Sequence, residues 1–297
     1  MRVLPRSGWG RRVALVLCWL GALFAGLAWH YTMATPVVFQ ADIALPDYPE
    51  AAPPVRVVLL SDIHVSGPDM PPRRLANIVN QINGLHPDLV AIAGDFISDK
   101  AIATKHYSYR EALVPLTGLR PKLGTVAVLG NHDHWRNSGD ARAELGRNGI
   151  VVLQNEAVRM GPLAIGGVDD YYTAHSDGAK TAAAMERVGG AALVITHSPD
   201  LFPIMPGNAR LMLAGHTHCG QIRYPWGGSP ATMSRFGERY SCGRVDEKGR
   251  TLIVTGGLGT SILPFRLFSK PDLWVITLHA EASTQKGARA VARTPSR

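Results

Sequence analysis

Cysteine is scarce in this chain: Cys18, Cys219 and Cys242 are the three among 297 residues. Three cysteines are too few for a disulfide scaffold, and they lack the closely paired spacing of a zinc ribbon or finger. Cys18 lies within an apolar run, which leaves Cys219 and Cys242 as the one pair able to form a disulfide. A buried free thiol at Cys219, or a weak soft ligand near a metal, is the alternative that the sequence leaves open.

The formal net charge is +8, but the body of the chain, residues 40–280, has almost no excess of basic residues. Residues 1–39 hold four arginines and no acidic residue, and residues 281–297 have a net charge of +3. Residues 40–280 have a net charge of only +1. A nearly neutral body does not present the basic face of a nucleic-acid-binding protein, so we expect no nucleic-acid partner. The sequence leaves the oligomeric state open.

Residues 13–29 contain no charged side chain, and with their flanks they are long enough to cross a bilayer. We therefore predict a transmembrane helix or signal anchor over 13–31, a buried core helix and a cleaved signal peptide being the alternatives. Arginines precede this run within residues 1–12, and the next basic residue is Arg56. By the positive-inside rule, residues 1–12 form a cytoplasmic basic segment and the body is exported. The export route stays open.

The ends of the chain are predicted to be extended or disordered. Residues 32–54 contain five prolines and are predicted to form an extended tether. Residues 281–297, rich in Ala, Arg, Thr and Ser, are predicted to form a disordered basic tail. Residues 55–280 remain as one large folded domain.

Apolar runs typical of buried strands alternate with helical patterns along the body. We predict strands near 55–60, 89–93, 125–129, 150–153, 162–166, 191–196 and 209–214. Helices are predicted near 72–85, 105–118, 139–148 and 177–188. Strands that alternate with helices indicate a layered α/β fold, in which a ligand crevice forms at the carboxyl ends of the strands.

Polar motifs of metal-ligand type follow five of these strands. Each motif alone is weak, because a histidine or aspartate after a strand is more often a hydrogen-bonded turn residue. Carboxylates, imidazoles and an amide without thiolate suit Mn, Fe, Zn, Co or Ni. In chain order the motifs are Asp62-Ile63-His64, Gly94-Asp95, Gly130-Asn131-His132-Asp133, His197 and Gly215-His216-Thr217-His218.

This series of five motifs resembles the calcineurin-like metallophosphoesterase superfamily. Gly167-Val168-Asp169-Asp170, Thr196-His197-Ser198-Pro199-Asp200 and Leu263-Pro264-Phe265-Arg266 further resemble its bacterial membrane-associated branch of YaeI/YkuE-type phosphodiesterases. The resemblance implies a four-layer α/β/β/α sandwich of two mixed sheets over 55–280, the catalytic domain, with one N-terminal transmembrane helix. It also implies a metal-dependent phosphoric ester hydrolase, either a phosphodiesterase or a pyrophosphatase. Together with the charge pattern, it predicts a single-pass protein of the bacterial inner membrane, with its catalytic domain on the extracytoplasmic side.

The resemblance also assigns roles to individual residues. Two divalent ions are implied, with Asp95 as a bridge and His132 as general acid or transition-state stabiliser. A shared carboxylate partly offsets the repulsion between two cations about 3.5–4 Å apart, and a metal-activated hydroxide would attack phosphorus in line. Asp133 either orients His132 or caps the turn, and His134 is predicted to lie at the surface. The implied ligands are Asp62, His64 and His218 for the first ion, and Asn131, His197 and His216 for the second.

Two features leave the function partly open. Ser98 departs from a superfamily pattern that has an acidic or amide residue three positions after the bridging aspartate, and Asp99 follows it. Asp169-Asp170 fits either turn capping or substrate contact. Aromatic and apolar residues after the last motif fit either a lipid-linked phosphodiester or pyrophosphate, or the packing of a long loop. The alternative functions are a non-catalytic metal-binding scaffold and a cytoplasm-facing hydrolase of UDP-diacylglucosamine-type pyrophosphates. The residues after the last motif are Ile222, Tyr224, Trp226, Phe236 and Tyr240.

Overall fold

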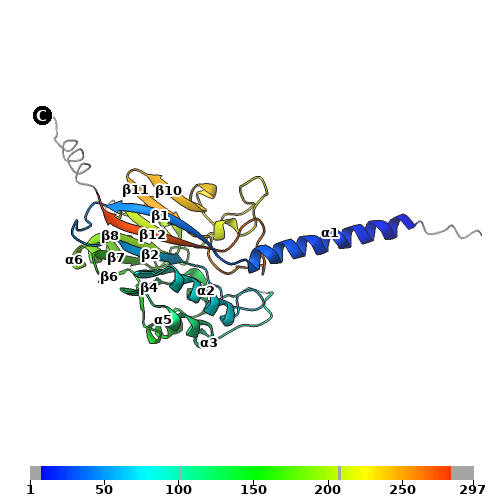
Figure 1. The fold of residues 1–297 in the computed structure, drawn as a ribbon, viewed down its shortest axis with the longest axis horizontal. Helices are drawn as coiled ribbons and strands as arrows, with labels where there is room; N and C mark the ends of the chain where they lie inside the picture. The colour runs from blue at the N-terminus through cyan, green and yellow to red at the C-terminus, as the bar shows by residue number, and fades with distance from the viewer. Residues whose placement is uncertain (1–7, 101, 207–208, 282–297) are drawn as a thin grey trace, which may run out of the picture.

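A computed structural model describes residues 8–100, 102–206 and 209–281 (Figure 1). The predicted disordered tail lies outside the described residues apart from Glu281, as do residues 1–7 of the predicted basic segment. Residues 8–12 of that segment belong to the first helix, α1 (Gly8–Met33).

Two six-stranded sheets form the body of the domain. In the first sheet β2 to β5 are parallel, β12 runs antiparallel to β2, and β1 runs parallel to β12. In the second, β7, β8, β9 and β11 are parallel, with antiparallel β6 and β10 at the edges. The first has the order β1 (Val37–Leu45), β12 (Asp272–Ala280), β2 (Val55–Leu60), β3 (Leu89–Ala93), β4 (Gly124–Val128), β5 (Ile150–Val152). The second has the order β10 (Gly243–Glu247), β11 (Arg250–Val254), β9 (Leu211–Ala214), β8 (Ala191–Thr196), β7 (Leu163–Val168), β6 (Glu156–Met160).

Three apolar cores separate four layers, which confirms the predicted α/β/β/α sandwich. Alternate side chains of β2 point to opposite faces of its sheet: Val58 and Leu60 join the core under the helices, whereas Val57 and Leu59 join the core between the sheets. The third core lies between the second sheet and α6. The helices are α2 (Pro72–Gly84), α3 (Tyr109–Leu113), α4 (Asn131–Arg136), α5 (Ser138–Arg147) and α6 (Gly178–Val188).

The helix predicted over 105–118 is shorter in the structure. Only Tyr109–Leu113 is α-helical, and a 3-10 turn follows over Val114–Gly118. Pro115 explains the change, because it has no N–H to donate to the preceding turn of an α-helix. Strand β6 was not predicted, because its side chains are all half-buried or exposed and give no apolar run.

The prediction of an extended tether over 32–54 is wrong. Strand β1 pairs with β12 along its whole length, from Val37 opposite Asp272 to Leu45 opposite Ala280. Ile43 and Leu45 are buried in the core between the sheets. The prolines at 36 and 46 flank the strand and none interrupts it. Proline at the ends of an edge strand limits further strand pairing, so the same residues that indicated a tether bound an edge strand.

Helix α1 contains the predicted span and extends away from the domain (Figure 1). It is long and apolar enough to cross a membrane, a test that a signal sequence also passes. Only Ala28 and Thr32 among its described side chains are buried, so it is not a core helix of this domain.

The role of β1 can be tested with two substitutions in the full chain. Leu45→Ala should lower the free energy of unfolding by about 2–5 kcal/mol, because it leaves a cavity between the sheets. The matched change Val37→Ala, at an exposed position of the same strand, should cost within about 0.5 kcal/mol. Chemical denaturation followed by circular dichroism measures both values. Equal small effects would mean that β1 contributes nothing to the core.

Candidate metal centre

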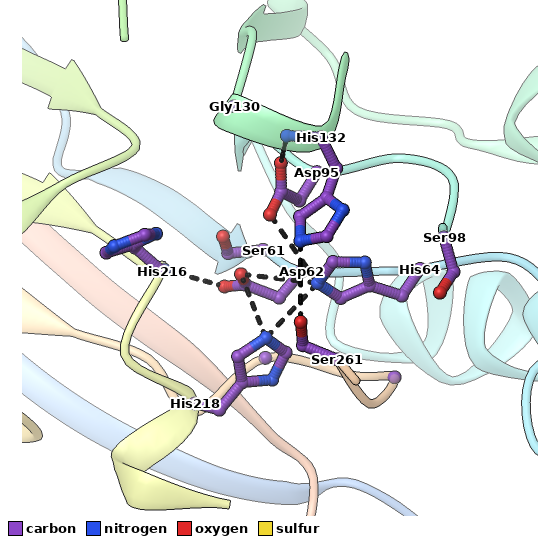
Figure 2. A network of polar contacts seen from close by, with 12 residues as sticks. Ser61, Asp62, His64, Asp95, Ser98, Gly130, His132, His216, His218 and Ser261 are labelled. Atoms are coloured by element: carbon purple, nitrogen blue, oxygen red, sulfur yellow. Dashed lines mark hydrogen bonds and ion pairs between the residues drawn. The ribbon is translucent and has the colours of Figure 1, made fainter. Parts of the chain in front are cut away.

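All five predicted motifs lie where strands end, on the same side of the two sheets. The motifs after β2, β3 and β4 come from the first sheet, and those after β8 and β9 come from the second. Figure 2 shows Asp62, His64, Asp95 and His218 directed toward one another, with His216 bound to Asp62 through its backbone. All seven predicted metal ligands are buried.

The first group of predicted ligands is compact enough to hold one ion. His64 Nε2 lies 3.1 Å from His218 Nε2, and Asp62 Oδ1 lies 3.4 Å from His218 Nε2 and 3.9 Å from His64 Nε2. Two nitrogen or oxygen ligands, each about 2.1 Å from one metal, lie about 3–3.4 Å apart. The geometry of Asp62, His64 and His218 therefore fits a shared cation.

The second group has the same spacing, and Asp95 lies between the two. His197 Nε2 is 3.1 Å from Asn131 Oδ1 and 3.2 Å from His216 Nδ1. Asp95 Oδ2 is 3.2 Å from His197 Nε2 and 3.5 Å from His64 Nε2, so one carboxylate oxygen faces both groups. Its other oxygen, Oδ1, accepts a hydrogen bond from the backbone N–H of His132 at 2.9 Å.

The donor set fits a cation because it leaves a buried carboxylate oxygen without a hydrogen bond. Asp62 is fully buried, and its Oδ1 accepts none, whereas Oδ2 accepts from the backbone of His216 at 2.9 Å. Burial raises the pKa of Asp62 to about 6. Burial also disfavours the charged form of Asp95, but the adjacent His197 lowers its pKa well below the usual range. Such groups are costly unless they are paired or bind a metal.

The backbone is turned sharply at most of the ligands. Left-handed conformations at residues other than glycine are uncommon and cost about 1–2 kcal/mol each. Here they let a side chain point back into the site directly after its strand ends. Gly130, before Asn131, is needed for a related reason, because a Cβ there would contact the Asp95 carboxylate. The left-handed ligands are Asp62, His64, Asp95, His216 and His218, with φ from 47° to 70°.

Asp133 caps the turn and does not orient His132. Its carboxylate accepts hydrogen bonds from the backbone N–H groups of Asp95 at 2.9 Å, Gly130 at 3.0 Å and Phe96 at 3.2 Å. These contacts join the loop after β3 to the loop after β4. Asp133 therefore fixes Asp95 and Asn131 relative to each other.

His132 lies at the edge of the two ligand groups, beside Asp99. Its Nδ1 is 3.4 Å from Asp99 Oδ2, and its Nε2 is 3.4 Å from Ser261 Oγ. Burial opposes protonation of this imidazole, but the carboxylates of Asp99 and Asp95 raise its pKa overall. Sequence reasoning noted Asp99 but gave it no role, because it stands one position beyond the superfamily pattern.

The prediction that His134 lies at the surface is wrong. Its Nε2 is 2.8 Å from Asp169 Oδ1, and each side chain is 6% exposed. The His134 ring also stacks on His175 at 4.1 Å. Asp169 thus anchors α4, the helix that begins at Asn131, whereas Asp170 caps a turn by accepting a hydrogen bond from the Thr173 backbone N–H. No sequence spacing indicated the pairing of residues 134 and 169.

Arg266 is a second residue that sequence reasoning left without a role. Its guanidinium is fully buried, donates to the carbonyl oxygens of Gly256, Gly257 and Gly259, and lies 3.4 Å from His218 Nδ1. Burial lowers the pKa of Arg266 to about 10, which leaves it charged at neutral pH. Its backbone N–H donates to Thr32 Oγ1 of α1 at 2.7 Å.

Cys219 and Cys242 form a disulfide, which resolves the alternatives in favour of the bridge. Their Cα atoms are 4.7 Å apart. Cys219 directly follows His218, so the bond fixes the loop that presents His216 and His218. Nearby, Thr217 Oγ1 donates to the carbonyl of Ser241 at 2.6 Å and reinforces the same connection.

A cavity of about 310 Å³ opens beside the candidate ligands. Its polar part includes Asp95, Asn131, His132, His216, His218 and Ser261. The rest of the cavity wall is largely apolar, with Trp135, Tyr172, Ile222, Met233, Ile262 and Leu263.

The four aromatic residues named after the last motif differ in burial. Tyr240 packs in the core, whereas Tyr224, Trp226 and Phe236 are exposed, so burial in the core accounts only for Tyr240.

The chain is similar to several curated proteins. It is 30% identical to YkoQ of Bacillus subtilis, an uncharacterized metallophosphoesterase, over 76% of this chain and 83% of that protein. It is 28% identical to the uncharacterized metallophosphoesterase YkuE of the same bacterium, over 75% of this chain and 78% of that one. A Danio rerio transmembrane protein with a metallophosphoesterase domain is 29% identical, over 82% of this chain and 57% of the fish protein.

Two solved structures are more distant. The Haemophilus influenzae NAD nucleotidase NadN matches with a TM-score of 0.44 and 14% identity, over 69% of this chain and 45% of that one. A Thermus thermophilus 5'-nucleotidase precursor matches with a TM-score of 0.42 and 11% identity, over 81% and 58% of the two chains. This chain thus spans about half of each of those proteins.

The family is shown by a profile match that spans the candidate site. Residues 55–220 match the family profile described as calcineurin-like phosphoesterase, and this range contains every predicted ligand and His132. The described residues carry all five motifs in the expected order and at the ends of the expected strands. The chain is therefore a metal-dependent phosphoesterase that belongs to the calcineurin-like metallophosphoesterase family.

Proposed function

We propose that this protein hydrolyses a phosphodiester or pyrophosphate with two divalent ions, and that its substrate is lipid-linked. The position of Asp95 Oδ2 between His64 and His197 carries the dinuclear part of the proposal. Asp62, His64 and His218 would hold one ion, and Asn131, His197 and His216 the other. Asp95 would be shared. Mn, Fe, Zn, Co and Ni all suit these ligands.

The ions and the residues around them would have different roles in the reaction. When bound, the ions supply the Lewis acidity that activates water and stabilises charge on the phosphoryl group. His132 would donate its Nε2 proton to the leaving oxygen, because this nitrogen faces Ser261 at the cavity while Nδ1 faces Asp99. The Asp99 carboxylate would hold the proton on Nδ1 and keep the ring oriented.

Metal content should separate the ligand role from the acid role. Asp95→Asn should lower the content of both ions, because it weakens the one contact shared by the two groups. His132→Ala should retain both ions. Elemental analysis of the purified full chain, after metal removal and reloading, measures the stoichiometry. Since His132 also lies within ligand distance of His64 and Asp95, an empty His132→Ala protein would show that it is a ligand.

The reaction is tested with a panel of phosphate monoesters, diesters and pyrophosphates that includes lipid headgroup substrates. The metal-loaded protein should hydrolyse diesters or pyrophosphates, and the stripped protein should not. His132→Ala should slow turnover about 10²–10⁴-fold for esters with poor leaving groups. The loss should be smaller for p-nitrophenyl esters, because p-nitrophenolate leaves with little need for a proton. Metal binding without any turnover would indicate a non-catalytic scaffold instead.

We also propose that the domain lies on the extracytoplasmic side, held by an uncleaved α1. Arginines before the uncharged run of α1 over 13–29 support this orientation, and so does the Cys219–Cys242 disulfide, because disulfides persist in oxidising compartments. Retention is supported by part-buried hydrogen bonds at the end of α1. Arg74 donates to the carbonyl oxygens of Thr32 and Ala34, and cleavage after Ala34 would remove this contact surface.

Topology is measurable in a bacterial host with reporters fused after Arg297. A reporter that is active only outside the cytoplasm should give a signal, and a cytoplasm-specific reporter should not. Signal from the cytoplasm-specific reporter alone would instead favour the cytoplasm-facing hydrolase. N-terminal sequencing tests the anchor separately, since cleavage would give a chain that begins at Thr35.

A further inference from the structure

The end of α1 is held against the active-site side of the domain from two directions. On one side, the Arg74 side chain of α2 donates to the carbonyl oxygen of Thr32 at 2.7 Å. On the other, the backbone N–H of Arg266 donates to Thr32 Oγ1 at 2.7 Å. Thr32 is itself buried. These contacts fix how α1 leaves the domain.

The segment around Arg266 continues the surface of α1. The rings of Phe24 and Phe265 meet edge to face at 6.2 Å, and those of Tyr31 and Phe268 at 5.5 Å. In each pair, one ring belongs to α1 and the other to the segment over 261–268. The apolar surface of α1 therefore extends onto the domain.

A neighbouring turn is joined to this segment by backbone hydrogen bonds. Arg223 N–H donates to the carbonyl of Leu267 at 2.9 Å, and Leu267 N–H donates to that of Gln221 at 3.1 Å. The Gln221 side chain also donates to the carbonyl oxygens of residues 261, 263 and 265, each at 3.1 Å. The turn over 221–228 and the segment over 261–268 thus form one unit.

This unit exposes four large apolar or aromatic side chains, which we call the rim: Tyr224, Trp226, Ile262 and Phe268. Their exposed fractions are 42%, 81%, 66% and 36%. Tyr224 and Trp226 stack at 5.3 Å with ring planes 3° apart, which presents a flat aromatic face. Exposed apolar side chains gathered in this way mark an interaction surface, and tryptophan and tyrosine favour the headgroup level of a bilayer.

We infer that the rim is a second bilayer contact, which seats the mouth of the active-site cavity on the lipid surface that α1 crosses. The lipid is chosen as occupant because the rim is continuous with the end of α1. In Figure 1, α1 leaves the domain at the end where the loops after β9 lie, and α6 lies at the opposite end. The inference rests on the proposed membrane anchor and not on the proposed reaction.

Ile262 connects the rim to the substrate site. Its side chain belongs to the rim and also lines the cavity that holds His132 and the candidate ligands. A cavity with largely apolar walls that opens at the headgroup layer can accept a lipid phosphodiester. The phosphate enters the cavity while the acyl chains of the lipid alcohol remain in the bilayer. The inference therefore narrows the proposed substrate to a lipid embedded in the membrane that bears α1.

Depth-dependent quenching tests the contact in full-length protein reconstituted into phosphatidylglycerol vesicles. Cys18→Ala removes the one described free thiol, and bimane is then attached at Trp226→Cys, Phe268→Cys or Ala183→Cys. Ala183 is an exposed residue of α6 at the far end of the domain. Lipid with a nitroxide on acyl carbon 5 should quench bimane at 226 and 268 and leave 183 unaffected. Equal quenching at all three positions would overturn the inference.

A second measurement uses Trp226→Glu, which lies outside the cavity wall and changes only the rim. Turnover of a diacylglycerol phosphodiester of methylumbelliferone in vesicles should fall about tenfold. This is the effect expected when one large apolar side chain no longer inserts into the bilayer. Turnover of water-soluble bis-p-nitrophenyl phosphate should stay within about twofold, since the active site is intact. Equal losses on both substrates would overturn the inference. If neither substrate is hydrolysed by the unsubstituted protein, the proposed function fails, and quenching alone decides the bilayer contact.

Discussion

One shared carboxylate sets the requirements that the rest of the fold meets. Asp95 Oδ2 faces imidazoles from both ligand groups, so strands of two different sheets must end at the same place. The sandwich achieves this because β2, β3 and β4 end beside β8 and β9, and the core between the sheets keeps their ends aligned. A fold with only the first sheet would present three of the five motifs and lack His197, His216 and His218.

Collecting these groups is unfavourable without cations, and the surroundings supply partial compensation. Backbone N–H groups reach Asp95 and Asp62, and Asp133 anchors the two loops that carry Asp95 and Asn131. Arg266 adds a buried positive charge behind His218. The left-handed backbone at five candidate ligands is a further local cost. Together these features describe a centre whose groups are preorganised for metal, with backbone strain concentrated at the proposed ligands.

Much of the site was predictable because its residues follow apolar runs in a fixed order. The ligand motifs, the strands before them and a layered α/β fold could be inferred from the chain, and the family resemblance implied the four layers. The same reasoning failed where the determining contact lies far away in sequence. Asp169 reaches His134 from a different sheet, and Asp99 reaches His132 from the preceding loop. Composition also misled at β1, because prolines at both ends of a strand look the same as prolines within a flexible linker.

The connection between α1 and β1 is only three residues long, from Ala34 to Pro36. An enzyme on a long linker samples a volume of solution above the membrane, and its encounters depend on bulk concentration. With α1 as the proposed membrane anchor, a domain joined this closely to it would instead search in two dimensions. Its encounter rate with the proposed lipid substrate would depend on lateral diffusion and on molecules per unit area of bilayer. Dilution of the cell suspension would then leave turnover unchanged, whereas dilution of the substrate with other lipids would lower it.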